Sequence, residues 1–510
     1  MILIYPPVSK PSEPPAGIAK LAGFLRCHGV RCRLLDANLE GTMHLMNSAA
    51  LSFHKTPDTW SRRALRNWKG NVASLKDPET YAHVDRYKRA VADVNRVLEV
   101  SARDRGVIVG IANYQNSSLS PLRSSDLVRA AETPEENPFY PYFSKRLAEC
   151  IEQEQASCVG ISLTYLSQAL CSFAIAGFIK KRYPGLKIVF GGGLVTSWLS
   201  RPDWKNPFGG VIDHLIAGPG EYPLLALLGI EGDKRDCSAP DFDDLPVRDY
   251  LSPGTVLPYS ASSGCYWHKC SFCPEKAEGN SYIALPLQKV REDLRSLTSS
   301  MRPVLLHFLD NAISPALMQS LVENPPGLPW YGFARIEREL TDSAFCKALK
   351  RSGCVMLKLG IESGDQGVLD RMGKGISLDM VSLALKALKS AGIATYVYFL
   401  FGTPYETLTE ARRTLEFTVN HSEEISFLNL AVFNMPVCGE WAQDFETSSF
   451  YEGDLSLYTD FSHPDGWGRR QVRDFLENEY KKERSVAAVL KRDPPFFTSN
   501  HASFFVMQPH

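Results

Sequence analysis

Short hydrophobic runs alternate with amphipathic segments along much of the chain. Each run has the length of a β-strand, and each amphipathic segment has the periodicity of a helix. Strands and helices in alternation predict a parallel, doubly wound sheet, in which ligands bind beyond the carboxyl ends of the strands. In the first half, the predicted strands are at 1–5, 31–35, 158–165, 187–190 and 213–221, and the predicted helices are at 18–28 and in the segment that ends at Arg182.

Residues 41 to about 150 interrupt this pattern. The segment is polar and rich in Trp, Tyr and Arg, with helical periodicity at 81–101 and turn-forming residues in SSLSPLRSS and ETPEENPF. We interpret it as a largely helical insertion within a first, Rossmann-like α/β domain that spans residues 1–235. A stretch with little periodicity at 233–250 then predicts a linker.

The alternation of strands and helices returns at Tyr259 and continues to about residue 440. Five hydrophobic runs follow the segment that begins at Tyr259 and bring the total to about six strands, which is enough for an open or partial TIM-like α/β barrel over residues 250–440. Residues 441–510 are charged, have helical periodicity at 469–491 and predict a helical C-terminal cap. The five runs are at 304–310, 330–335, 355–363, 394–402 and 426–433.

The composition is that of an ordinary globular protein. With 44% hydrophobic and 22% charged residues, the chain is neither disordered nor fibrous, and its length corresponds to about two to four domains. A net charge of -1 gives no reason to expect nucleic acid or an anionic membrane as the main partner. Pro6 and Pro7 break the apolar run at the amino terminus, and no later run approaches the ~20 residues of a transmembrane helix, so we expect a cytoplasmic protein.

Three of the 12 cysteines are clustered, whereas the others are mostly scattered in apolar segments, as expected of reduced core thiols. Cys265, Cys270 and Cys273 lie within SSGCYWHKCSFCPE. Clustered thiolates bind soft metal centres, either a structural zinc ion or an iron-sulfur cluster. A closed zinc site needs a fourth ligand, which His268 could supply from within a small loop. A four-iron cluster on three cysteines leaves one iron open for another ligand, which suits catalysis.

This loop resembles the cluster loop of the radical S-adenosylmethionine (radical SAM) enzymes, in which three cysteines are spaced Cys-x3-Cys-x2-Cys with an aromatic residue before the last one. Phe272 stands at the aromatic position. The first gap is one residue longer here, because the four residues YWHK separate the first two cysteines. The resemblance implies a four-iron four-sulfur cluster on Cys265, Cys270 and Cys273.

Downstream segments resemble successive strand ends of the radical SAM barrel, in the same order. They are GFARIERELTD, LKRSGCVMLKLGIESGDQGVLDRMGKG and KSAGIATYVYFLFGTPYET, so the resemblance covers roughly residues 259–440, which no zinc-binding scaffold would predict. It implies that Arg335 pairs with the carboxylate of SAM, and the alternative is an ion pair of Arg335 with Glu337 or Glu362. The residues that the resemblance places at SAM are Phe272, Asp310, Arg335, Gly360, Glu362 and Ser363.

Asp310 and Asn311 follow the second strand of the predicted barrel. Many radical SAM enzymes carry Gly-Gly-Glu there, in contact with the amino group of SAM, and this sequence lacks that motif. By resemblance to the cobalamin-dependent branch of the family, Asp310 is a polar substitute. The alternative is that the Asp-Asn pair caps the following helix.

The first predicted sheet resembles the cobalamin-binding domain that is fused to one large branch of the radical SAM enzymes. Its signature is Asp-x-His-x-x-Gly, then Ser-x-Leu or a variant, then about 26 residues to Gly-Gly. Here DANLEG begins at Asp36 with Asn38 at the histidine position, and 26 residues separate Thr164 from Gly191. Small side chains at strand ends let a macrocycle approach the backbone. The implied cobalamin contacts are Pro7, Asp36, Asn38, Ser162, Thr164, Gly191, Gly192 and Glu221.

Asn38 has a consequence for the cobalt ion. The missing histidine implies that the protein offers no imidazole ligand, so that the lower face of the cobalt is unligated or occupied by another group, which favours homolytic methyl transfer. The alternative is a generic nucleotide-binding or purely structural domain. A dinucleotide site would have Gly-x-Gly-x-x-Gly after the first strand, where this chain has PPVSKPSEPP.

The resemblance implies a cobalamin-dependent radical SAM methyltransferase that acts on an unactivated carbon of a peptide or small-molecule natural product. A 5′-deoxyadenosyl radical would abstract a hydrogen atom, methylcobalamin would deliver the methyl group, and flavodoxin or ferredoxin would donate electrons. Two alternatives stay open. One is an enzyme with the same cofactors that oxidises, cyclises or rearranges its substrate, and the other is a non-catalytic zinc-binding scaffold.

Two segments have no assigned role. The insertion at 41–150 could bind a peptide partner or brace the two domains. The aromatic residues of the C-terminal segment could close the mouth of the barrel over a substrate, or they could pack in the core, which is the more common situation. These residues are Trp467, Tyr480, Phe496, Phe497, His501 and Phe504.

Overall fold

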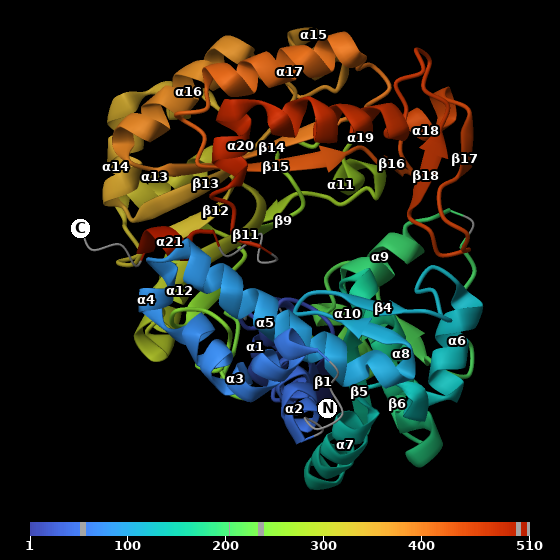
Figure 1. Cartoon of the computed structure of the whole chain (residues 1–510). Coiled ribbons are helices and arrows are strands. Elements are labelled where there is room, and N and C mark those ends of the chain that lie inside the picture. The colour runs from blue at the N-terminus through green and yellow to red at the C-terminus, as the bar shows by residue number, and fades with distance from the viewer. Residues whose placement is uncertain (52–57, 203, 233–238, 496–500, 507–510) are drawn as a thin grey trace. The chain divides into compact units, whose positions relative to one another are not determined.

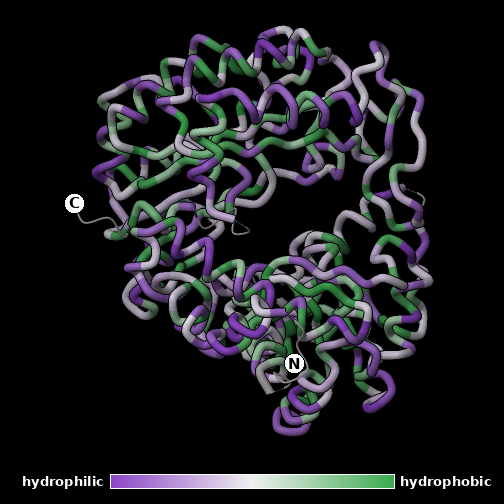
Figure 2. Tube along the Cα trace, viewed as in Figure 1, coloured by the Kyte–Doolittle hydropathy of each residue, from purple (hydrophilic) through white to green (hydrophobic). Residues whose placement is uncertain are grey.

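A computed structural model describes residues 1–51, 58–202, 204–232, 239–495 and 501–506. The chain divides into two compact units, each of which is described by itself. The first unit comprises residues 1–255 and 451–457, and most of the remaining chain forms the second unit. Figure 2 shows hydrophobic residues concentrated along the strands, whereas the helices carry both kinds of residue.

The first unit contains a five-stranded parallel sheet with the order β2-β1-β5-β6-β7 (Figure 1). This is the doubly wound order in which the chain reverses direction across the sheet between its first and third strands, here β1 and β5, and ligands bind at such a reversal. The predicted Rossmann-like α/β fold of the first half is confirmed. The strands are β1 (Ile2–Tyr5), β2 (Arg33–Asp36), β5 (Cys158–Ser162), β6 (Lys187–Gly191) and β7 (His214–Leu215).

Helices connect these strands, and the long connection between β2 and β5 is itself mostly helical. The connecting helices are α1 (Ala16–Cys27), α8 (Leu166–Arg182), α9 (Gly193–Leu199) and α10 (Glu221–Leu227). The long connection contains α2 (Ala37–Leu51), α3 (Thr59–Lys76), α4 (Pro78–Tyr81), α5 (Val84–Ala102), α6 (Ser124–Glu132), α7 (Tyr140–Glu154) and a hairpin of β3 (Val107–Val109) and β4 (Tyr114–Asn116). Helices α3 and α5 pack against each other, so this connection has a core of its own.

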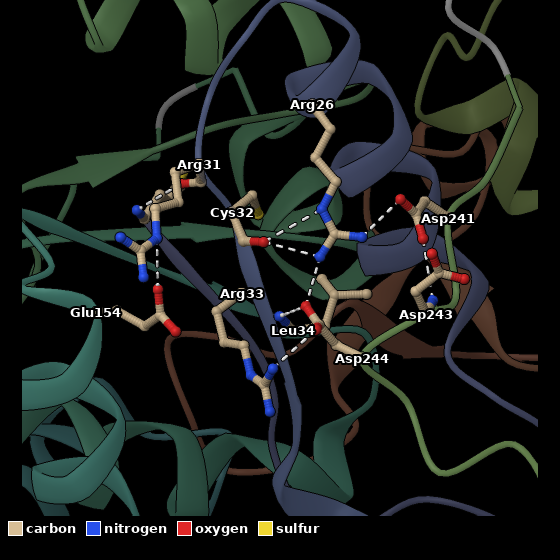
Figure 3. A network of polar contacts seen from close by, with 10 residues as sticks. Arg26, Arg31, Cys32, Arg33, Leu34, Glu154, Asp241, Asp243 and Asp244 are labelled. Atoms are coloured by element: carbon tan, nitrogen blue, oxygen red, sulfur yellow. Dashed lines mark hydrogen bonds and ion pairs between the residues drawn. The ribbon is translucent and has the colours of Figure 1, made fainter.

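Residues 239–255 run along the first unit without forming a helix or strand. They lie within the predicted linker and just beyond it, and residues 233–238 fall outside the described part of the chain. Figure 3 shows how Asp241 and Asp244 hold this segment against β2 and α1: Arg26 pairs with both, and Arg33 pairs with Asp244 at 2.9 Å. Asp244 also accepts a hydrogen bond from the amide of Leu34 at 3.0 Å. The described part of the predicted linker is therefore a fixed strap on the first unit.

The second unit contains a six-stranded parallel sheet with the order β15-β14-β13-β12-β11-β8. The predicted α/β barrel fold is confirmed. Its strands are β8 (Val256–Tyr259), β11 (Leu305–Ile313), β12 (Trp330–Ala334), β13 (Cys354–Glu362), β14 (Ala394–Phe401) and β15 (Phe427–Val432). The helices that follow them along the chain are α12 (Leu287–Met301), α13 (Pro315–Glu323), α14 (Ser343–Arg351), α15 (Gln366–Arg371), α16 (Leu378–Ala391) and α17 (Leu408–Asn420), and Figure 1 shows several of them outside the strands.

The end of the chain packs on the amino-terminal ends of the barrel strands. Ala502, Phe505 and Val506, in and beside α21 (Ser503–Val506), contact a cluster that includes Met356 and Phe427, each near the start of a strand. Trp467 and Tyr480 are buried as well. The described aromatic residues of this segment therefore pack in the core, as the more common alternative predicts, whereas Phe496 and Phe497 lie outside the described residues.

The remaining part of the C-terminal segment is only partly helical. Helices α19 (Arg469–Asn478) and α20 (Arg484–Leu490) fall where the periodicity predicts them, but residues 435–461 form a small antiparallel sheet that the sequence did not predict. Residues 451–457 group with the first unit, where Asp454 accepts a hydrogen bond from the amide of Ser124 at 2.8 Å. The elements of this part are β16 (Met435–Pro436), α18 (Trp441–Asp444), β17 (Thr447–Ser449) and β18 (Tyr458–Phe461).

Candidate functional site

The three clustered cysteines lie on one loop that follows the first barrel strand. After β8 the chain forms a short hairpin of β9 (Ser262–Ser263) with β10 (Ile283–Ala284), and the loop 264–273 and the one-turn helix α11 (Pro274–Ala277) lie between these two strands. Cys265, Cys270 and Cys273 are free thiols and partly buried. Because β8 is parallel to the other strands, this loop lies at the carboxyl edge of the sheet, where α/β barrels place their active sites.

The surroundings of the loop have opposing effects on the pKa values of its thiols. Burial raises the pKa of Cys270, whereas the positive charges of Lys374 and Arg335 lower it. Burial also raises the pKa of Cys273 to about 11, against the effect of backbone amides at the start of α11. The two cations and the backbone amides at the start of α11 therefore favour the thiolate, the form in which cysteine binds a metal. Among the described residues, no three His, Cys, Asp or Glu side chains come close enough together to hold a single metal ion.

The residues between the first two cysteines are anchored to other parts of the second unit. The guanidinium carbon of Arg335 lies 3.7 Å from the centroid of the Trp267 ring. The indole nitrogen of Trp267 donates a hydrogen bond to the carbonyl of Gly373 at 3.0 Å. Tyr266 donates a hydrogen bond to Glu337 at 3.2 Å, and Glu337 also pairs with Arg335 at 2.9 Å. Arg335 thus forms the ion pair with Glu337 that the sequence left as an alternative.

Gly360 and Glu362 lie at the end of β13 next to a buried cation. Lys374 pairs with Glu362 at 2.8 Å, and both side chains are almost entirely buried. A β-carbon at Gly360 would stand 2.4 Å from a carboxylate oxygen of Glu362 and 3.0 Å from the Lys374 nitrogen, so a side chain there would displace the ends of both side chains. Ser363 is fully buried, and its hydroxyl accepts a hydrogen bond from the amide of Asp365 at 3.1 Å. The structure brings Gly360 and Glu362 to the site, whereas Ser363 shapes the turn behind it.

Asp310 and Phe272 also lie beside the cysteine loop. The carboxylate of Asp310 accepts hydrogen bonds from the amide of Ala261 and the hydroxyl of Ser262, at the start of the hairpin, and burial raises its pKa. It does not cap a helix, because Ser314 caps α13, so the capping alternative is wrong. Phe272 packs against a hydrophobic cluster that includes Met372. Both residues position the loop in this structure.

Several barrel strands carry buried polar or aromatic side chains near their middle. The Lys358 nitrogen lies 3.3 Å from a ring nitrogen of His307, and the His307 ring stacks on Tyr331 with a centroid distance of 4.3 Å. Tyr396 and Tyr398 of β14 pack against each other at 4.7 Å. This interior offers hydrogen-bonding groups rather than a purely apolar cavity.

In the first unit, the predicted cobalamin contacts Asp36, at the end of β2, and Asn38, in α2, form hydrogen bonds within the protein. Asp36 is buried and accepts hydrogen bonds from Tyr250 at 2.6 Å and from the amide of Leu39 at 2.8 Å. Burial raises the pKa of Asp36 to about 6. The amide group of Asn38 forms two hydrogen bonds with the backbone of Ser9, at 2.8 and 2.9 Å. Asn38 therefore fixes the loop that follows β1.

Except for Glu221, the remaining residues lie at or just after the carboxyl ends of β1, β5 and β6. Ser162 ends β5 beside Gly191, which ends β6. Gly192 has a φ of +103°, and a β-carbon there would stand 2.6 Å from the carbonyl oxygen of Leu163, so only glycine fits. The amide of Thr164 donates to Gln168 at 3.0 Å, Pro7 is buried after β1, and Glu221 begins α10 and pairs with Lys20 at 3.0 Å. The sheet brings the strand-end residues to one edge.

Sequence reasoning missed Lys374, Trp267 and Tyr250. Lys374 lies between two glycines in MGKG, a motif of a tight turn, and such a turn beside the cysteine loop was a signal for a functional cation. Trp267 occupies the extra position of the first cysteine gap. Tyr250 carried no signal, because its partner Asp36 is more than 200 residues away in the chain.

Three partly buried thiols lie on one loop at the carboxyl edge of six parallel strands. Residues 259–418 match the model of the Radical SAM superfamily. This part of the chain is therefore similar to a superfamily whose members bind a four-iron four-sulfur cluster and SAM.

The curated relatives are distant. An uncharacterized methyltransferase of Pyrococcus horikoshii is 26% identical over 53% of this chain and 66% of its own length. The anaerobic magnesium-protoporphyrin IX monomethyl ester cyclase of Rubrivivax gelatinosus is 21% identical over 52% and 48%. The bacteriochlorophyllide d C-12(1)-methyltransferase of Chlorobaculum tepidum is 26% identical over 34% and 40%. The chain thus spans less than two thirds of the length of each relative.

Two solved structures share the fold. The methyltransferase TsrM from Kitasatospora setae, with tryptophan and a SAM analogue bound, has a TM-score of 0.51 and 15% identity, covering 85% of this chain and 73% of its own. The cobalamin-dependent enzyme OxsB, with aqua-cobalamin bound, has a TM-score of 0.51 and 13% identity over 63% and 57%. At these identities the likeness establishes the fold alone. Among the described residues, no helix is both long and apolar enough to span a membrane.

Proposed function

We propose that this protein is a cobalamin-dependent radical SAM methyltransferase that acts on an unactivated carbon of a peptide or small-molecule substrate. The observation that carries the proposal is the cysteine loop with its cations: three thiols at the carboxyl edge of the barrel, with Arg335 and Lys374 in electrostatic range of Cys270. Methylation is supported by two relatives that are named methyltransferases.

The donor set fits an iron-sulfur cluster and SAM. Thiolates are the ligands of such clusters, and three of them leave one iron open for the substrate. Gly360 and Glu362 offer a tight backbone approach and a carboxylate beside that position, and Arg335 offers a guanidinium for the carboxylate of SAM. We assign these residues, with Asp310 and Phe272 as supports of the loop, to SAM binding.

The first unit fits cobalamin. We assign cobalamin to the carboxyl ends of β1, β5 and β6, where Ser162, Thr164, Gly191 and Gly192 have small side chains or none. Asn38 stands in the histidine position of the signature, and its amide is already bonded to Ser9. The chain therefore offers cobalt no imidazole there. We assign residues 1–235 to the cobalamin domain, 250–440 to the barrel and 441–510 to a C-terminal cap.

When bound, the cluster supplies the electron that cleaves SAM, and cobalamin carries the methyl group. The protein supplies position and charge. Arg335 and Glu362 would hold the polar ends of SAM, and the hydrophobic cluster that includes Met356 and Phe427 would exclude water near the amino-terminal ends of the strands. The polar interior around His307 and Lys358 suits a substrate with hydrogen-bonding groups. An external electron donor such as flavodoxin or ferredoxin completes the proposal.

A second candidate function is cyclisation or oxidation with the same cofactors. It is favoured by the similarity to a magnesium-protoporphyrin ester cyclase, which covers 52% of this chain. The two candidates share the cluster and differ in the product. Transfer of a labelled methyl group from SAM to the substrate identifies a methyltransferase, and a product without that label identifies the second candidate.

The cluster itself is tested by replacing Cys265, Cys270 and Cys273 together by Ala. After anaerobic reconstitution, we expect the wild-type protein to bind iron and sulfide, to show a broad charge-transfer absorbance and to form 5′-deoxyadenosine from SAM with a reductant. The triple variant should do none of these. Cys438→Ala, a partly buried thiol of the same unit, is the control and should behave as wild type. Formation of 5′-deoxyadenosine by the triple variant would contradict the proposal.

A further inference from the structure

We propose that Trp267 is a positioning residue that holds the Arg335 guanidinium in the orientation needed to bind the carboxylate of SAM. Trp267 is one of the four residues that lengthen the gap between Cys265 and Cys270. The inference rests on the proposed function, because it takes the cluster and SAM as the occupants of the site. It gives the unusual spacing of the cysteines a physical purpose.

The stack between Trp267 and Arg335 is close and buried. The guanidinium carbon lies 3.7 Å from the centroid of the indole, and the Arg335 side chain is only 5% exposed. A cation over an aromatic face is attracted by the ring quadrupole, more strongly where water is excluded. The Lys269 nitrogen lies 4.7 Å from the same ring centroid and adds a second cation. The indole is therefore held by charge as well as by packing.

A glycine turn is shaped to receive the indole. The indole nitrogen donates to the carbonyl of Gly373 at 3.0 Å. A β-carbon at Gly375 would stand 2.3 Å from the indole ring, so a side chain there would displace it. Gly375 also has a φ of +65°, which favours glycine. The turn and the lengthened loop thus fit each other, although about 100 residues separate them in the chain.

The turn also fixes the guanidinium. Arg335 donates through Nη2 to the carbonyl of Gly375 at 2.8 Å and through Nε to Glu337 at 2.9 Å. Among the described residues, Nη1 has no hydrogen-bond partner. A guanidinium binds a carboxylate through such N–H groups, and its fork geometry makes the orientation decisive. With one face on Trp267 and two of its five N–H groups engaged, the guanidinium keeps the Nη1 N–H groups and one Nη2 N–H to meet a ligand, as far as the described residues show.

The extra residue of the loop makes these contacts compatible. His268 is exposed and has a φ of +48°, so the chain makes a left-handed turn between Trp267 and Cys270. That turn lets Tyr266 reach Glu337 at 3.2 Å while Trp267 covers the neighbouring Arg335. Both members of the ion pair are therefore held by the lengthened gap.

Trp267→Phe, Trp267→Leu, Arg335→Lys and the double variant W267L/R335K test the inference. Each is reconstituted anaerobically and assayed for iron and sulfide per chain, for the dissociation constant of SAM, and for the change that SAM causes in the electron paramagnetic resonance spectrum of the reduced cluster. Trp467→Phe is the matched control, because it also removes an indole hydrogen bond in this unit, to Glu406, without touching Arg335.

We expect wild-type iron and sulfide in all variants. Loss of the stack should weaken SAM binding by about 2- to 30-fold in W267L, and by less in W267F, which keeps a ring. Since Trp267 acts through Arg335, W267L/R335K should bind SAM no more weakly than R335K alone. W467F should bind SAM as wild type.

Wild-type affinity in W267L, or additive losses in the double variant, would overturn the inference while leaving the proposed function intact. If W267L loses iron, W267F decides: wild-type iron with weaker SAM binding supports the inference, and unchanged binding overturns it. A wild-type protein that takes up neither iron nor SAM would refute the proposed function and the inference with it.

Discussion

Glu406 is a buried carboxylic acid, and its ionisation should lower the stability of the second unit as the pH rises towards about 8. It lies in the loop between β14 and α17 and is 1% exposed. One of its oxygens accepts hydrogen bonds from the amide of Gly402 and, at 3.1 Å, from the indole of Trp467. The other oxygen has no partner among the described residues. Burial, with smaller contributions from Glu410 and Asp365, raises its pKa from 4.5 to about 8.

The sign of the effect follows from proton binding. Between pH 4.5 and about 8 the folded protein holds a proton on Glu406 that the unfolded chain has lost, so stability falls as the pH rises through this window. One pKa unit corresponds to about 1.4 kcal/mol, and from pH 6 to pH 9 the loss amounts to roughly 2 to 3 kcal/mol. Glu406→Gln keeps an acceptor oxygen for Gly402 and Trp467 but cannot ionise. The free energy of unfolding of the variant, relative to that of the wild type, should therefore rise by this amount between pH 6 and pH 9.

The assay is urea unfolding of both proteins at pH 6, 7, 8 and 9, followed by tryptophan fluorescence. The difference between the two free energies of unfolding is the quantity of interest, because other titrating groups contribute equally to both proteins and cancel. A difference that stays constant across this range would show that Glu406 does not hold a proton in the folded state, and it would refute the reasoning.

Two further predictions concern the two units separately. Gly360→Ala should disrupt the Lys374–Glu362 pair, since the new methyl carbon would stand 2.4 Å from the carboxylate; we expect SAM binding to weaken by roughly 10-fold or more with iron content unchanged, and equal SAM affinity would contradict this. Tyr250→Phe removes a donor to buried Asp36 and should cost about 1–3 kcal/mol in urea unfolding. Because that hydrogen bond lowers the raised pKa of Asp36, the cost should be larger at pH 8 than at pH 5, and an equal cost at both would show that Asp36 stays protonated.

Much of the fold could be predicted because its strands are hydrophobic and regularly spaced. The runs at 187–190 and 394–402 are mostly apolar, as expected of buried parallel strands, and both form strands in the structure. The small sheet at 435–461 was missed because its strands are two to four residues long and partly polar, and Thr447 and Ser449 are exposed. Such strands depend on their partners rather than on their own pattern.

The site was predictable where chemistry is local in the chain. Three cysteines within nine residues predict a soft-metal loop on their own. The contacts around it join different elements of the fold: Arg335 lies against Trp267 of the cysteine loop, and Lys374 pairs with Glu362 at the end of β13. The same reason explains why Asp310 was open to interpretation as a helix cap, since its partners Ala261 and Ser262 lie on another strand and hairpin.

The strap at 239–255 has a consequence for association between molecules. Strand β2 is at the edge of its sheet, and an uncovered edge strand can form backbone hydrogen bonds with a strand of another molecule. The Asp244 carboxylate accepts a hydrogen bond from the Leu34 amide, so an amide of this edge strand is already engaged by the strap. By occupying part of the edge, the acidic strap should disfavour pairing of this sheet with a strand of another molecule.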